Sequence, residues 1–375
     1  MTPPQFLELA LSVSAQAAIV VAITHWLGRV TNSEQTKCQL WVACHSLILL
    51  LVGIGLLLPH LRVFHPWSTV NEKSALVLLD VQQKLGEAVF WIWAAGFVVA
   101  LVAFVLRTFQ INRFIRDCRE IDLNQISLGM PDNELAIDHS GAQQTVKILA
   151  NDAVAGPFCW QFHRPYIVLP NFLLGLDRRQ LHLIIRHELA HLRAGHPVQL
   201  FIQRVVEMIF WFHPIVWWSS HQSALAREFA CDAAVVESPG GVSDYLHTLL
   251  AVIQAGTGRP EAPSASISFG RGKTIVTKRA ERLVAIARGV RPKRVLRLSP
   301  VAAHASLIVL TVLVSFVRMP VNISASAKSP WSPWPTWSAH VLHDFGVQAR
   351  DFETYDHGFQ EVHELLIEKQ HLHRD

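Results

Sequence analysis

Hydrophobic residues in this chain are concentrated in four long runs. The runs cover residues 6–28, 38–59, 88–106 and 301–317. An α-helix needs about 20 mostly apolar residues to cross the hydrocarbon core of a bilayer. The last run is short, but Pro300 and Arg318 mark its two ends. The pattern therefore predicts an α-helical protein that crosses a membrane four times.

The stretch between the third and fourth runs mixes polar and apolar positions and is the candidate for a folded domain. Basic residues stand next to the membrane at both of its ends: Arg107, Arg113, Arg116 and Arg119, then Arg288, Arg291, Lys293, Arg294 and Arg297. Such residues mark the cytoplasmic side of a membrane protein. The domain is therefore expected in the cytoplasm, and both chain termini outside it. The expected division is 1–107 for three spans, 108–300 for the domain, 301–318 for the fourth span and 319–375 for an extracytoplasmic tail.

The first part of this domain is rich in short β-prone runs. They cover residues 146–149, 158–162 and 166–169 and predict a small sheet ahead of the helices. An exposed edge of such a sheet can pair with an extended peptide. The same strands would serve equally well as a hairpin that covers the core. Helical patterns follow over residues 243–255 and 278–288, so the domain is expected to be α+β.

The stretch LHLIIRHELAH, residues 181–191, carries residues that bind metals. His187 and His191 are four apart, so on an α-helix their side chains lie on one face and can bind the same ion. Glu188 is placed to reach a water molecule on that ion. Asp177 is a good N-cap, so the motif is expected to stand on a helix. Without a third ligand, the pattern describes only a helix with two structural histidines.

A second helical stretch supplies that third ligand. In ALAREFACDAAVVE, residues 224–237, Glu228 and Asp232 are again four apart on one face. Zinc in hydrolases commonly takes three protein ligands and keeps one position for water. Glu228 is the predicted third ligand, and Asp232 is predicted to hold a ligand histidine by its other ring nitrogen. Hydrolysis of a peptide bond at such a site would produce a negatively charged oxygen, the oxyanion, which needs a hydrogen-bond donor. The candidate donors are His213, His221 and Tyr245.

The apolar stretch 198–218 decides whether this site can exist. A further membrane crossing here would place Glu228 across the bilayer from His187. Polar residues recur on roughly one face of the stretch, and Pro214 interrupts the pattern. We therefore interpret it as an amphipathic or partly embedded helix and not as a full span.

The motifs H-E-L-A-H and R-E-F-A-C-D occur together with two further stretches, GPFCWQFHRPYIVLP (156–170) and WFHPIVWW (211–218). In this combination the chain resembles the M56 metallopeptidases, the membrane proteases typified by the BlaR and MecR β-lactam sensors. The resemblance is close over about residues 128–255. The stretches 156–170 and 211–218 favour this family over M48 membrane proteases, which share the metal-binding motifs.

The resemblance implies a gluzincin-type zinc metalloprotease domain, with Zn²⁺ on His187, His191 and Glu228 and with Glu188 as the general base. It implies a signal-transducing endopeptidase in the cytoplasmic (inner) membrane of a bacterium. The substrate would be a cytoplasmic protein such as a transcriptional repressor. Many relatives have Asp where His196 stands, so no role for His196 follows from the resemblance.

The C-terminal part of the chain departs further from the family. The β-lactam sensors carry a penicillin-binding domain with a nucleophilic Ser-x-x-Lys after the last span. The 57 residues 319–375 are too few for such a domain, and no Ser-x-x-Lys occurs in the sequence. The sequence therefore does not support β-lactam sensing through an acylated serine.

Composition agrees with a membrane protein. Hydrophobic residues make up 51% of the chain and charged residues 17%. The net charge of +4 comes with no contiguous basic surface beyond the membrane-flanking sites, which argues against direct nucleic-acid binding. The five cysteines form no paired framework and are expected to be free thiols.

Two points stay open at this level. A non-proteolytic membrane receptor or scaffold with a structural zinc site is the alternative function, although such a site has no need of Glu188. The oligomeric state is not fixed by the sequence, and a homodimer is one arrangement that it allows.

Overall fold

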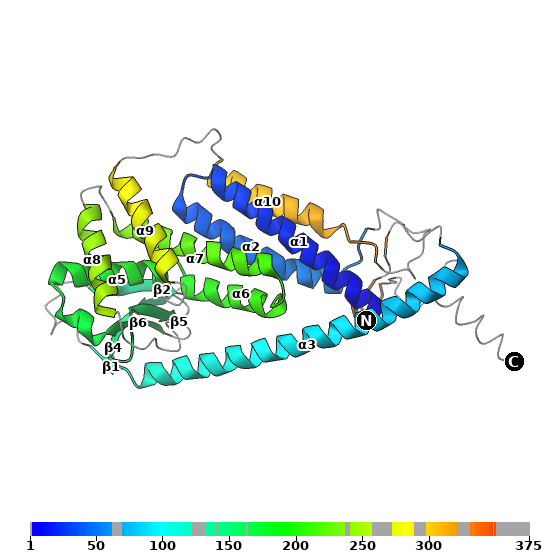
Figure 1. The fold of residues 1–375 in the computed structure, drawn as a ribbon, viewed down its shortest axis with the longest axis horizontal. Helices are drawn as coiled ribbons and strands as arrows, with labels where there is room; N and C mark the ends of the chain where they lie inside the picture. Colours follow the sequence, from blue (N-terminus) through cyan, green and yellow to red (C-terminus); the bar gives the residue numbers. More distant parts are fainter. Residues whose placement is uncertain are drawn as a thin grey trace.

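The structure is a computed structural model that describes residues 2–61, 70–121, 132–139, 142–161, 164–236, 241–256, 272–288, 298–321, 331–332, 334–347 and 349. It is an elongated molecule with a helical bundle in its middle (Figure 1). A small sheet and the helices that cover it form one end.

Three helices in the described part of the chain are long and apolar enough to cross a membrane: α1 (Pro3–Val30), α2 (Glu34–Leu57) and α3 (Glu72–Arg116). Helices α2 and α3 begin at capping side chains, since Ser33 and Asn71 each accept a hydrogen bond from a backbone N–H three residues later. Helix α10 (Pro300–Ser315) is apolar but has only 16 residues, which make it about 24 Å long. The first three predicted spans coincide with long apolar helices, and the fourth crossing stays a prediction.

Helix α3 is much longer than the span predicted over residues 88–106. Its 45 residues make it about 68 Å long, against a hydrocarbon core of about 30 Å. None of the residues in the most apolar part of α3 is fully buried by the protein, as expected of a helix with a surface that faces lipid. The polar part before it is also helical and carries an ion pair between Asp80 and Lys84 (2.7 Å). Hydropathy marks only the part of a helix that lies in lipid. The length of α3 is therefore underestimated from the sequence.

The ends of α1, α2 and α10 meet at two levels of the bundle. At one level the N–H of Leu61 donates to the carbonyl of Phe316 (2.9 Å), and at the other the N–H of Leu298 donates to the carbonyl of Val30 (3.4 Å). The second level, where α1 ends and α2 begins, is the one that the basic residues predict to be cytoplasmic. The sheet and its helices lie at this same end of the bundle (Figure 1).

The sheet contains the three strands that the sequence predicts and one short addition. Its strands, in the order β1-β4-β6-β5, are β1 (Arg119–Glu120), β4 (Lys147–Asn151), β6 (Pro165–Pro170) and β5 (Phe158–Gln161). Strands β4 and β6 are parallel, β5 and β6 are antiparallel, and β5 is an edge strand. A separate hairpin of β2 (Ala136–His139) and β3 (Ala142–Thr145), preceded by the short α4 (Asp132–Leu135), was not predicted.

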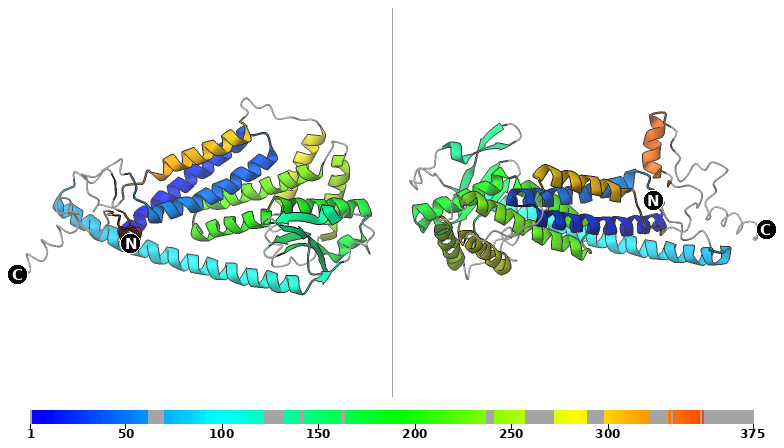
Figure 2. Two further views of the ribbon diagram at one scale, coloured as in Figure 1. Left: turned by 180° about the vertical axis from the view of Figure 1, so that it is seen from behind. Right: turned by 90° about the horizontal axis from the view of Figure 1, so that it is seen from above.

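Helix α5 (Arg178–Arg193) follows the sheet after a 3₁₀ turn (Asn171–Gly175) and packs against strands β5 and β6 (Figure 2). Its apolar face, which includes Leu181, Ile185 and Leu189, is buried together with Ile167 of β6. The predicted N-cap is confirmed: the carboxylate of Asp177 accepts hydrogen bonds from two backbone N–H groups of the first turn. The sheet and the cap thus fix the helix that carries the H-E-x-x-H motif.

Replacing the N-cap is expected to weaken this helix measurably. Asp177→Ala removes the acceptor for two backbone N–H groups, which should lower the free energy of unfolding by about 1 kcal/mol. Asp177→Asn keeps an acceptor and should cost much less. Thermal unfolding of the full chain in detergent measures both variants. Equal melting temperatures for Asp177→Ala and the unchanged chain would contradict the prediction.

The stretch 198–218 is not a single helix. It consists of parts of two helices that are joined by a turn. Helix α6 (His196–Ile209) ends before the turn, and α7 (Pro214–Val235) begins with Pro214 at its first position. Proline is favoured there because the backbone N–H that it lacks would have no partner in the first turn of a helix. Gly195, with a φ of 66°, allows the sharp connection from α5 to α6. The α6–α7 hairpin returns the chain to α5, so no extra crossing separates Glu228 from His187.

The tip of the α6–α7 hairpin lies inside the helical bundle. Nε2 of His213 contacts the carbonyl of Ser14 in the middle of α1 (3.2 Å), and the indole N–H of Trp93 on α3 donates to the carbonyl of Ile209 (2.9 Å). Residues of α6 and α7 belong to the same hydrophobic core as those of α1 and α2. The hairpin is therefore part of the bundle, and its partial embedding in the membrane stays a prediction.

Three further helices complete the described part of the chain. Helices α8 (Gly241–Gly256) and α9 (Gly272–Ala287) lie beside α5 and α7 at the sheet end, and α11 (Thr336–Asp344) projects from the far end (Figure 2). The helices predicted over 243–255 and 278–288 are both present, and α9 starts earlier than expected. The five cysteines, all in described segments, are free.

Candidate metal centre

The two histidines of α5 point to the same place. Nε2 of His187 lies 3.2 Å from Nε2 of His191, and both side chains are largely buried. They occupy one face of the helix, one turn apart, as their spacing requires. Glu188 is buried between this face and the core, with 6% of its surface exposed.

Helix α7 brings Glu228 to the same point from 37 residues along the chain. Its carboxylate oxygens lie 3.5 Å from Nε2 of His187 and 3.5 Å from Nε2 of His191. Two ligands of a tetrahedral zinc ion, each bound at about 2.0–2.1 Å, are about 3.3 Å apart. Two imidazole nitrogens and one carboxylate at this spacing fit such an ion. The structure brings all three predicted ligands together, and their role as zinc ligands stays a prediction.

The protonation states of His191 and Glu228 suit the binding of a cation. Burial lowers the pKa of His191 to about 3, so its imidazole is neutral at pH 7. Burial by itself would raise the pKa of Glu228, but the Arg279 guanidinium and the two histidines outweigh it and hold that pKa well below its usual range. A neutral imidazole and an ionised carboxylate are the forms that bind a metal.

Tyr245 of α8 and Asp232 of α7 support His187 from behind. The Tyr245 hydroxyl lies 2.8 Å from Nδ1 of His187 and donates to the Asp232 carboxylate (2.7 Å). The Asp232 oxygen itself lies 3.4 Å from the same Nδ1. Asp232 therefore stands where the sequence places it, behind a ligand histidine, but the tyrosine hydroxyl carries the short contact.

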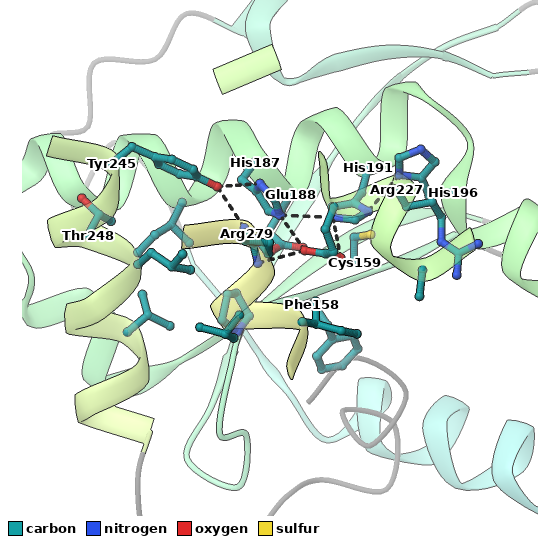
Figure 3. Close-up of a pocket in the computed structure, with 18 of the residues that line it drawn as sticks. Phe158, Cys159, His187, Glu188, His191, His196, Arg227, Tyr245, Thr248 and Arg279 are labelled. Atoms are coloured by element: carbon teal, nitrogen blue, oxygen red, sulfur yellow. Dashed lines mark hydrogen bonds and ion pairs between the residues drawn. The ribbon is translucent and has the colours of Figure 1, made fainter. Parts of the chain in front are cut away.

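Arg279 of α9 contacts both carboxylates of the site, Glu228 and Asp232. Figure 3 shows its side chain among the residues that line a cavity. It donates to both oxygens of Asp232 (3.0 and 2.6 Å) and to the Tyr245 hydroxyl (3.1 Å), and its Nη1 lies 2.9 Å from Glu228. Its side chain is only 10% exposed. Sequence reasoning missed Arg279, because nothing in the helical pattern KRAERLVAIAR separates it from the neighbouring basic residues.

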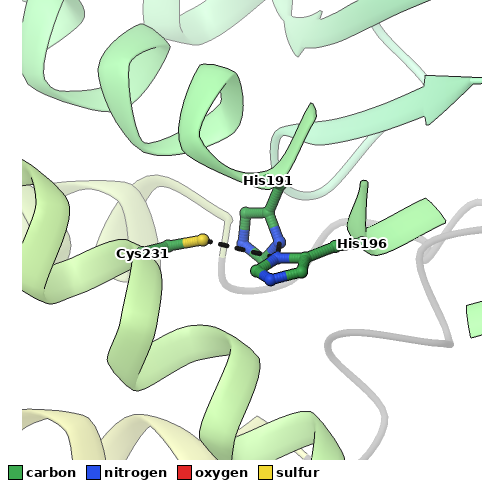
Figure 4. Close-up of side chains that lie close together, drawn as sticks. All are labelled: His191, His196 and Cys231. Carbon is green, nitrogen blue, oxygen red and sulfur yellow. Dashed lines mark hydrogen bonds between the residues drawn. The ribbon is translucent and has the colours of Figure 1, made fainter. Parts of the chain in front are cut away.

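A second group of potential ligands adjoins the first. Nδ1 of His196 lies 2.9 Å from Nδ1 of His191 and 3.5 Å from the Cys231 sulfur (Figure 4). The 2.9 Å between the nitrogens is a hydrogen-bond distance, shorter than the about 3.3 Å between two ligands of a tetrahedral ion. Burial lowers the pKa of His196 to about 2, so this histidine is neutral. The spacing favours a hydrogen bond between the two imidazoles over a second ion.

A cavity of about 160 Å³ opens beside the three predicted ligands. Glu188 lines it, and burial raises the pKa of this carboxyl to about 7. A carboxylate with a pKa near the working pH is suited to take up and release a proton. The edge strand and helices α8 and α9 also contribute to its wall, through residues that include Phe158, Cys159, Thr248, Leu249 and Ile275.

Two of the candidate oxyanion donors do not occupy the position expected of them. His213 stands at the opposite end of α7 from Glu228, about 22 Å along the helix. Tyr245 is engaged behind His187 with Asp232.

Comparisons with known proteins find relatives of this chain. The model of the family described as BlaR1 peptidase M56 matches residues 66–281, which include all the residues of the candidate centre. The chain is also similar to the regulatory protein BlaR1 of Bacillus licheniformis, with 21% identity over 184 residues. That match covers 48% of this chain and 28% of the relative's length.

Proposed function

We propose, from the premise that this chain belongs to the BlaR1 peptidase M56 family, that it is a membrane-embedded zinc endopeptidase of the signal-transducing type. Apolar helices and the family together make it a membrane metallopeptidase. The observation that carries the finer proposal is the convergence of His187, His191 and Glu228 within 3.5 Å of one another. This donor set, with a cavity on its open side, suits zinc in a hydrolytic site.

The chain's own residues have distinct tasks in peptide hydrolysis. His187, His191 and Glu228 would hold the ion, which when bound would polarise the scissile carbonyl and acidify a water molecule. Glu188 accepts the proton of that water and delivers it to the leaving amine. Tyr245 and Asp232 fix the orientation of the His187 ring through its Nδ1.

The edge strand β5 offers a place for the substrate backbone. Phe158 and Cys159 of this strand line the cavity, and only one side of β5 is paired within the sheet. An extended peptide can add to such an edge by main-chain hydrogen bonds. This arrangement favours a flexible segment of a protein as the substrate.

The position of the site supports cleavage on the cytoplasmic side. The site stands at the end of the bundle where α1 ends and α2 begins, which is the end with the basic residues of α3, Arg113 and Arg116. We propose a cytoplasmic protein, such as a transcriptional repressor, as the substrate, and the bacterial cytoplasmic membrane as the location. The name of the Bacillus licheniformis relative, a regulatory protein, supports a signalling role.

Zinc dependence tests the proposal directly. The full chain, purified in detergent, is expected to bind one zinc ion and to cleave some members of a library of internally quenched peptides. Removal of the ion by a chelator should abolish cleavage, and added Zn²⁺ should restore it. His191→Ala should bind zinc much more weakly and show no restoration.

The outcomes separate the enzyme from the alternative. A tightly bound zinc ion without cleavage of any peptide or protein would favour a receptor or scaffold with a structural site. Cleavage that persists at the same rate in the metal-free protein or in His191→Ala would overturn the proposed centre.

A further inference from the structure

His196 stands between a proposed metal ligand and a membrane helix. It is the first residue of α6, and 3% of its surface is exposed. Its Nδ1 lies 2.9 Å from Nδ1 of His191, and its Nε2 lies 3.4 Å from the sulfur of Cys38 on α2. The ring therefore contacts His191 and Cys38 through opposite nitrogens, and the sulfur of Cys231 lies 3.5 Å from the nitrogen that faces His191.

The positions of the protons follow from the hydrogen-bonding capacity of each group. With Nε2 of His191 on the ion, its Nδ1 carries the proton and donates it. Nδ1 of His196 then accepts, so the proton of His196 is on Nε2 and points to the Cys38 sulfur. The Cys38 thiol lies 3.7 Å from the side-chain carbonyl oxygen of Gln199, whose amide donates to the backbone of Ala194 (2.7 Å). Every donor in this chain points away from the metal centre.

We propose that His196 is the positioning residue of His191 and that Cys38 fixes His196, so that one hydrogen-bonded chain joins membrane helix α2 to the metal centre. This rests on the proposed function, because it requires an ion on Nε2 of His191. Removing the partner behind a metal-binding histidine typically weakens metal binding 10–100-fold. Since Cys38 belongs to a membrane helix, a shift or rotation of α2 displaces the partner of a metal ligand.

Two substitutions of His196 separate its two contacts. The side-chain oxygen of Asn occupies the position of Nδ1 of His, and the terminal atoms of Gln occupy that of Nε2. His196→Asn therefore keeps an acceptor for His191 and loses the contact with Cys38, whereas His196→Gln does the reverse. Zinc affinity of the full chain in detergent is measured by competition with a chelator, and the absorption spectrum of the cobalt-substituted protein reports the geometry of the ligands.

His196→Gln is expected to weaken zinc binding by about 10–100-fold and to change the cobalt spectrum. His196→Asn and Cys38→Ala, which remove only the link to α2, should each weaken zinc binding by about threefold to tenfold. Cys44→Ala is the matched control, because Cys44 is equally buried on α2 and lies about 9 Å along the helix from Cys38. It should leave zinc binding unchanged.

Each contrary result overturns a defined part of the inference. Equal zinc affinity of His196→Gln and the unchanged chain would show that His196 does not position His191. An equal effect of Cys38→Ala and Cys44→Ala would remove Cys38 from the chain of contacts, and this pair decides the point even where His196→Gln does not fold. Failure of the unchanged protein to bind zinc would overturn the proposed function itself and this inference with it.

Discussion

Glu188→Gln is expected to reduce peptide cleavage by about 100-fold or more while the protein keeps its zinc. The substitution leaves the size of the side chain unchanged and removes only its ability to take up a proton. Glu188 is not one of the three groups that converge on the ion position, and it lines the cavity beside them. The loss should therefore appear in the rate of cleavage and not in the zinc content. Both quantities can be measured on one sample, by peptide cleavage and by metal analysis.

An exposed carboxylate of the same region is the control. Asp244, at the start of α8, forms an ion pair with Arg179 (2.6 Å) in which both side chains are substantially exposed. Such an exposed ion pair contributes little to the stability of a protein. Asp244→Asn should therefore leave cleavage and zinc binding unchanged. Cleavage by Glu188→Gln at the rate of the unchanged protein would rule out Glu188 as the general base. Loss of zinc in this variant would mean that Glu188 supports the ion instead.

Arg279→Ala is expected to destabilise the protein by about 3–5 kcal/mol and to weaken zinc binding. The guanidinium neutralises two largely buried carboxylates, Asp232 and Glu228, and contacts the hydroxyl of Tyr245. Removing one partner from a buried ion pair leaves an unpaired charge in a region of low dielectric constant, which is the reason for the large cost. Thermal unfolding and chelator competition measure the two effects.

Two further variants make this test specific. Arg279→Lys keeps the charge but lacks the planar fork that reaches three partners at once, so it should recover only part of the loss. Arg288→Ala replaces an exposed arginine just after α9 and should change neither property. Stability of Arg279→Ala equal to that of Arg288→Ala would contradict the role of Arg279 in joining the two carboxylates.

The metal-binding motif is the part of the site that the sequence predicts best. His187, Glu188 and His191 are neighbours on one helix, so their spacing alone fixes their relative positions. Glu228 and Asp232 could be added because they have the same spacing on a second helix. Arg279 could not be found in this way, because its role depends on how α9 packs against α7, and no local pattern records that packing.

The boundaries of the helices could also be predicted only where local residues determine them. Hydropathy located the apolar part of α3 but not its polar extensions, since it reports on lipid contact and not on helix formation. Pro214 was recognised as an interruption, and the structure shows that it starts α7 after a reversal of the chain. A proline at the first position of a helix and a proline that breaks a helix look alike in one sequence.

The sequence by itself determined the apolar helices, the basic flanks of the segment between them, and the spacing of the histidine pair on α5 and of the carboxylate pair on α7, because each of these depends on residues close together in the chain. Only the tertiary structure decided that the α6–α7 hairpin returns Glu228 to His187, that Arg279 joins the two carboxylates, and that His196 connects His191 to Cys38. These contacts join residues from different helices. They depend on how the apolar face of one helix packs on another, which the spacing of residues along the sequence does not show.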